Sequence, residues 1–118
     1  MIKKINPTKW EKMVKDKWIE KFKQEILPQI IKEYNPEKIL LFGSRVKGES
    51  DEDSDLDIIV ISDSFNKIPF INRMSHLLKK FKFQKHVDYL CYTPEEFERL
   101  KNQSSILIDA LEYAETII

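Results

Sequence analysis

Three aspartates stand where carboxylates can serve as metal ligands. Asp55 and Asp57 are one residue apart at the start of the apolar run Leu56–Ile61, and alternate side chains of a strand share one face. Asp88 lies inside another apolar run, where an ionised carboxylate is costly unless it is paired or bound to a metal. Carboxylate oxygens suit magnesium. The pattern therefore predicts that the three aspartates and substrate phosphates hold two magnesium ions, an arrangement that supports phosphoryl chemistry.

The chain has only two glycines, and both lie in the segment before the first two aspartates. Glycine permits positive φ and close backbone approach, so a strand that ends in Gly43 and Ser44 can present amides and a hydroxyl to a phosphate. Arg45 and Lys47 add positive charge just before Gly48. We therefore expect a phosphate to bind here, and Ser44 could also cap a short helix, a role compatible with phosphate binding.

Two other ligand-binding motifs fail on spacing. Residues 43–50 have the spacing of a phosphate-binding P-loop, but Glu49 occupies the lysine position and would repel phosphates. In an EF-hand calcium loop that begins at Asp51, the first of the acidic residues 51–53, Leu56 would replace the glycine at position six and Ser62 the glutamate at position twelve. These acidic residues are therefore interpreted as a solvated turn.

Apolar periodicity predicts an α/β protein. A stretch from Trp10 to Tyr34 has helical spacing, and Pro28 is expected to kink it or to divide it into two helices. Asn35–Pro36 ends it. One sheet with helices packed on it follows from the remaining elements. These are strands at 38–42, 56–61 and 87–92, a helix at 70–81, a helix that begins at 93–96, and a last helix from Ser104 or Ser105 to the end.

The composition fits one soluble domain in the cytoplasm. The 118 residues, 42% of them hydrophobic, suffice for one core, and no apolar run approaches the ~20 residues that a membrane span needs. No secretory signal is evident.

Cys91, the only cysteine, excludes an internal disulfide and is expected in a buried strand. His76 is expected on a helix and His86 at a strand edge, and neither is assigned to the site because neither has an evident partner.

The order of Gly43–Ser44, Gly48 and Ser54–Asp57 resembles the signature of the DNA polymerase beta nucleotidyltransferase superfamily, and residues 40–45 resemble its minimal nucleotidyltransferase branch. Lys47 stands where that branch often has arginine. The resemblance implies a nucleotidyltransferase fold, with a small mixed sheet of at least three strands flanked by helices.

By this resemblance the nucleotidyltransferase domain covers residues 20–118, and residues 1–19 form an N-terminal helical extension. Trp10 and Trp18 of the extension are expected in the core or at an interface, and its lysines on a solvated face. Binding of RNA or of a partner protein there stays open.

The resemblance also implies the roles of the site residues. Asp55 and Asp57 would hold both Mg²⁺ ions, and Asp88 would complete the catalytic metal site. Gly43–Ser44 would contact the triphosphate of the nucleotide, with Arg45 as a supporting phosphate contact.

Members of the minimal branch commonly occur as antitoxins beside a helical HEPN ribonuclease, and some add AMP to a tyrosine of that partner. The leading hypothesis is therefore transfer of a nucleoside monophosphate, with ATP the expected donor, to a HEPN-type helical protein. The alternatives are a noncatalytic antitoxin or regulatory binding module, and transfer to an antibiotic-type small molecule. Neither a membrane nor sequence-specific nucleic acid is an expected partner, and a homo-oligomer stays open.

Overall fold

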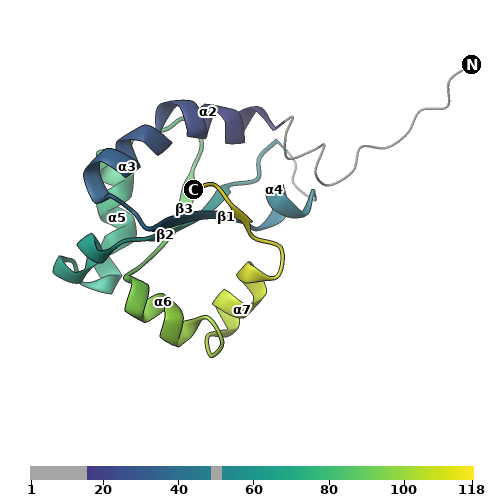
Figure 1. The fold of residues 1–118 in the computed structure, drawn as a ribbon. Helices are drawn as coiled ribbons and strands as arrows, with labels where there is room; N and C mark the ends of the chain where they lie inside the picture. Colours follow the sequence, from purple (N-terminus) through teal and green to yellow (C-terminus); the bar gives the residue numbers. More distant parts are fainter. Residues whose placement is uncertain (1–15, 49–51) are drawn as a thin grey trace, which may run out of the picture.

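The computed structural model describes residues 16–48 and 52–118, which form a four-stranded mixed sheet with helices on both faces (Figure 1). β1 (Lys38–Phe42) is antiparallel to β2 (Leu56–Ile61), and β3 (Val87–Tyr92) is parallel to β2. β4 (Glu115–Thr116) is antiparallel to β1, so the order across the sheet is β3-β2-β1-β4. The prediction of an α/β fold with a mixed sheet of at least three strands is confirmed, and the three predicted strands have the predicted bounds.

Seven helices are present in the described residues, one of them a 3-10 helix. None is long and apolar enough to cross a membrane. The helices are α2 (Lys17–Glu25), α3 (Leu27–Tyr34), α4 (Ser44–Lys47), the 3-10 helix η1 (Asp63–Lys67), α5 (Phe70–Lys80), α6 (Pro94–Leu100) and α7 (Ser105–Leu111).

The N-terminal helical stretch divides just before Pro28. Asp16 caps α2, because its Oδ1 accepts hydrogen bonds from two backbone amides of the first turn at 2.9 and 3.3 Å. Pro28 lies in the first turn of α3, where no amide donor is needed. Asn35, with a φ of 44°, ends α3 in the left-handed conformation. Division at Pro28 and termination at Asn35 are both confirmed, whereas the predicted helical residues 10–15 lie outside the described part of the chain.

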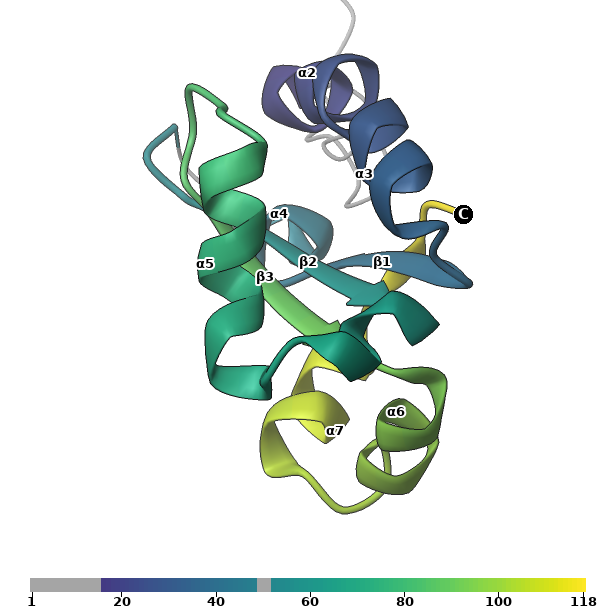
Figure 2. The same cartoon turned by 90° about the vertical axis from the view of Figure 1, so that its left-hand side faces the viewer.

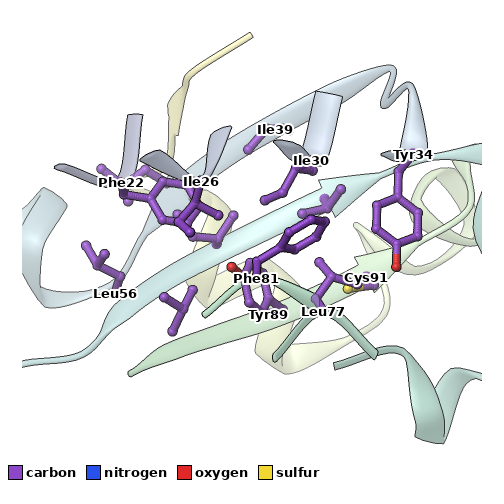
Figure 3. Close-up of a cluster of buried hydrophobic side chains, with 14 of the residues drawn as sticks. Phe22, Ile26, Ile30, Tyr34, Ile39, Leu56, Leu77, Phe81, Tyr89 and Cys91 are labelled. Atoms are coloured by element: carbon purple, nitrogen blue, oxygen red, sulfur yellow. The ribbon is translucent and has the colours of Figure 1, made fainter. Parts of the chain in front are cut away.

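Two hydrophobic clusters lie on opposite faces of the sheet. Figure 2 shows α2 and α3 above the sheet and α6 and α7 below it. The upper cluster is drawn in Figure 3, where Phe22, Ile26 and Ile30 of the first two helices face the strands beside Leu77 and Phe81. The lower cluster joins α6 and α7 to the strand residues that point the other way. It contains Leu40, Ile59, Ile61, Tyr92, Leu107 and Ala110.

The predicted start of α6 is confirmed by its capping contacts. Thr93 Oγ1 accepts a hydrogen bond from the amide of Glu96 at 3.2 Å, and Glu96 Oε1 accepts one from the amide of Thr93 at 2.8 Å. Buried Arg73 of α5 donates to the same Glu96 at 2.6 Å and to the carbonyl of Cys91 at 3.1 Å. These contacts fasten α5 and α6 to the end of β3, where Cys91 is buried as predicted.

The C-terminal segment differs from the prediction. α7 ends at Leu111, and the chain then returns to pair Glu115 and Thr116 with Leu41 and Leu40 of β1. The predicted helix that runs to the end of the chain is therefore wrong. The open edge of β1 offers backbone donors and acceptors, and pairing satisfies them better than one more helical turn without a buried face.

Candidate functional site

β2 and β3 place two aspartates side by side. Asp57 is the register partner of Asp88 in the parallel pair. Alternation along each strand puts Asp57 on the face of Ile59, and Asp88 on the face of Leu90, so both carboxylates point to the side of the sheet that carries α6 and α7. Asp55 lies one residue before β2 at the same end. The predicted convergence of the aspartates from two strands is therefore present in the geometry.

A histidine joins two of these aspartates. One ligand atom from each of Asp55, His86 and Asp88 lies within 4.8 Å of the other two, so the three side chains could hold a metal ion. His86 Nε2 is 3.0 Å from Asp88 Oδ1. His86, which is not assigned to the site from sequence because no partner is evident there, therefore has a partner in the structure. Its spacing of two residues from Asp88 on an extended segment was the available signal, because such side chains share a face.

Asp57 needs the glycine that faces it across the sheet. Gly43 has a φ of 81°, and a Cβ atom on it would lie 2.9 Å from Cγ of Asp57 and closer still to one carboxylate oxygen. Any other residue would therefore be strained and would displace the carboxylate. Gly43, not Ser44, is the residue before the first turn of α4, and no side chain makes a capping hydrogen bond to that helix. The alternative role of Ser44 as a helix cap is wrong.

Partial burial and the neighbouring negative charges disfavour ionisation of Asp57. Partial burial is the largest cause that raises the pKa of Asp57, from 3.8 to about 6, and the negative charges of Asp88 and Asp55 add to the rise. Arg45 and His86 oppose it. A cation held between the carboxylates would remove this repulsion, so the donor set fits a divalent metal ion.

A pocket of about 220 Å³ opens beside Asp57. Gly43 and Lys47 form one wall, and Ile106 and Asp109 of α7 form another. The pocket therefore brings the strand end and the positive charge of Lys47 together with two aspartates, Asp57 and Asp109. A phosphate bound here would need a cation beside the carboxylates, because like charges repel.

Arg45 has partners inside the protein. Its side chain is 4% exposed, and its guanidinium donates to the carbonyl of Ser54 at 2.6 and 3.1 Å and to Asp16 Oδ2 at 2.6 Å. The expected contact of Arg45 with a phosphate stays a prediction. In the structure the guanidinium points toward the backbone segment that leads to Asp55. Arg45 therefore positions that segment and ties it to the start of α2.

A second set of contacts holds Glu52. Lys17 and Trp18 of α2 bind its carboxylate at 3.2 Å each, and Lys85 donates to its backbone carbonyl. Trp18 packs against the upper cluster, which agrees with the expectation that it lies in the core or at an interface. Glu52 is exposed, and it does not belong to the group of side chains that could hold a metal ion. Both observations agree with the interpretation of an acidic, solvated turn. Asp51 and Trp10 lie outside the described residues.

Comparisons with known proteins agree with this geometry. A crystal structure of a candidate nucleotidyltransferase from Sulfolobus solfataricus superposes with a TM-score of 0.58, over 82% of this chain and 84% of that one, at 23% identity. At that identity the likeness shows the fold. No curated protein matches the chain. The family model described as "Nucleotidyltransferase domain" matches residues 19–115, which include every residue of the candidate site. The chain therefore belongs to the nucleotidyltransferase domain family of the DNA polymerase beta superfamily.

Proposed function

We propose that the protein transfers a nucleoside monophosphate from a nucleoside triphosphate, with ATP the expected donor, to a hydroxyl group of a partner protein. The observation that carries this proposal is the convergence of Asp55, Asp57 and Asp88 at one end of the sheet, beside Gly43 and the adjoining pocket. Membership of the family supports nucleotidyl transfer as the reaction class.

The chain supplies ligands and a place for the phosphates. Asp55 and Asp57 would hold both Mg²⁺ ions, and Asp88 would complete the catalytic metal site. Gly43–Ser44 receives the triphosphate, and Lys47 balances its charge from the wall of the pocket. Magnesium, when bound, lowers the pKa of the acceptor hydroxyl and neutralises the departing pyrophosphate. The acceptor hydroxyl loses its proton to solvent as its oxygen bonds to the α-phosphorus, and the bond from that phosphorus to pyrophosphate breaks, so that pyrophosphate leaves with the electron pair.

Exposed apolar side chains favour a protein as the acceptor. Ile106 is 64% exposed at the rim of the pocket, and Ile108 and Tyr113 on and after α7 are also exposed. A hydrophobic rim next to a charged centre suits contact with another protein better than contact with a polar antibiotic. By the resemblance of the motif to the minimal branch, we assign the partner to the HEPN class of helical proteins, and this chain to the antitoxin of the pair.

One experiment separates this function from its alternatives. The protein is incubated with Mg²⁺, each labelled nucleoside triphosphate in turn, and the protein encoded beside it. We expect label on that partner, reduced at least about 100-fold by Asp55→Asn or Asp88→Asn, because each removes a ligand. Asp63→Asn, an exposed change at the other end of β2, serves as the matched control.

Equally tight partner binding without label, in wild type and variants alike, would contradict the proposal and establish a noncatalytic binding module. When an antibiotic is added to the same incubation, label that appears on it in place of the partner would assign the protein to the small-molecule transferases.

A further inference from the structure

His86 lies where a metal ligand would lie, although the signature of three aspartates contains no histidine. It precedes β3, and its carbonyl accepts a hydrogen bond from the amide of Leu56 at 3.1 Å, so its backbone is fixed to the first residue of β2. Leu56 and Val87 are register partners in the two parallel strands. Asp55 comes just before Leu56 and His86 just before Val87, so the two residues occupy equivalent positions at the ends of neighbouring strands. This register keeps the two side chains beside each other.

The distances fit coordination of one ion. Ligands at about 2.1 Å from an octahedral ion are about 3 Å apart when adjacent and about 4.2 Å apart when opposite. His86 Nε2 and Asp88 Oδ1 are 3.0 Å apart, and the ligand atoms of Asp55, His86 and Asp88 all lie within 4.8 Å of one another. This upper limit of 4.8 Å is close to the distance of about 4.2 Å between opposite ligands. The side chains of His86 and Asp88 are 49% and 47% exposed, so an ion and its remaining water or phosphate ligands have access.

An imidazole ligand changes which metal the site prefers. Magnesium takes oxygen ligands and keeps much of its water, whereas first-row transition ions bind imidazole nitrogen readily. A site of two carboxylates and one imidazole is therefore suited to a transition ion that still accepts phosphate oxygens.

We propose that His86 coordinates, through Nε2, the divalent metal held by Asp55 and Asp88, and that the site therefore binds Mn²⁺ more tightly than Mg²⁺. The proposal rests on the proposed function for the identity of the metal site, and it extends that function by adding a nitrogen ligand and a choice of metal. The competing role is a hydrogen bond from the imidazole that only positions Asp88.

Pulsed electron paramagnetic resonance of bound Mn²⁺ distinguishes the two roles. The ion is added to the full chain alone and with inorganic tripolyphosphate, which contributes phosphate oxygens but no nitrogen. We expect nitrogen coupling typical of a directly bound imidazole in wild type and its loss in His86→Gln. His76→Gln is the matched control, since it changes the one other histidine, exposed on α5, and should retain the coupling.

Titration calorimetry adds a second readout. We expect His86→Gln to weaken Mn²⁺ binding about tenfold or more and Mg²⁺ binding less than about threefold. Absence of nitrogen coupling in wild type, or equal weakening for both ions, would overturn the proposal and leave His86 as a positioning residue. Coupling without nucleotide transfer under any metal would refute the proposed function alone, whereas transfer without coupling would refute this inference alone.

Discussion

Replacing Asp57 by asparagine measures how strongly burial and the charges of Asp88 and Asp55 together disfavour the ionised carboxylate of Asp57. Asparagine keeps the shape of the side chain and removes its charge. The folded protein raises the pKa of Asp57 from 3.8 to about 6, so the folded state binds this proton more tightly than the unfolded state does. Stability is therefore lost as the pH rises through this interval, and the loss is complete above about pH 6. Asp57→Asn has no carboxyl group to ionise at this position, so its stability does not fall for this reason as the pH rises.

The size of the effect follows from the same shift. Each pKa unit corresponds to about 1.36 kcal/mol, so a rise from 3.8 to about 6 sets an upper bound of about 3 kcal/mol. Asp57 is only partly buried, and solvent screens part of the repulsion from Asp88 and Asp55. We therefore expect Asp57→Asn to raise the free energy of unfolding by about 1–2 kcal/mol at neutral pH and by almost nothing near pH 4.

Urea unfolding between about pH 4 and about pH 8, with chelator present to remove divalent ions, provides the measurement. Asp63→Asn is the control, because this aspartate is exposed on η1 at the other end of β2. Its effect should not change between the two ends of the pH range. A variant at position 57 that is no more stable than wild type at neutral pH, or equally stabilised near pH 4, would refute the reasoning.

Three further changes test the surroundings of the site. Gly43→Ala forces a Cβ against Asp57 at positive φ and should cost about 2 kcal/mol in urea unfolding and reduce nucleotide transfer. Asp16→Asn removes the negative charge that pairs with the buried guanidinium of Arg45 and should cost about 3 kcal/mol, measured in the same way. Thr93→Ala removes the cap of α6 and should cost about 1 kcal/mol while transfer activity stays unchanged, which separates stability from catalysis.

The elements predicted from sequence are those whose signals are local. The three strands at 38–42, 56–61 and 87–92 are apolar runs that each end at a polar residue or glycine, so their bounds follow from the chain itself. β4 has only two residues, Glu115 and Thr116, both exposed. Its existence depends on the open edge of β1, and no pattern within the two residues contains that information.

The same distinction applies to the site. Strand alternation was enough to predict that Asp55 and Asp57 share a face, and the cost of a carboxylate inside an apolar run indicated Asp88 as a further ligand. That Asp88 lies beside Asp57 depends on the parallel register of β2 and β3, which only the structure shows. The partner of Arg45 could not be predicted, since Asp16 lies 29 residues earlier and outside the residues that carry the signature. A charged residue next to a phosphate motif is expected to face the phosphate, and only the tertiary structure shows that this one faces the protein.

The repulsion among the aspartates explains why metal and stability should be linked in this fold. An ion that binds only the folded state stabilises it by about 2.7 kcal/mol at 100 times its dissociation constant, more than the cost expected from Asp57. In chelator, Asp57→Asn should be more stable than wild type. Saturating Mg²⁺ should therefore reverse this order and make wild type the more stable of the two. If Mg²⁺ acted only by ionic screening, the gain in the free energy of unfolding would be smaller, and KCl at the same ionic strength would produce the same gain. An order that inverts with Mg²⁺ and not with KCl thus identifies the aspartates as a binding site whose charge is tolerated because a cation occupies it.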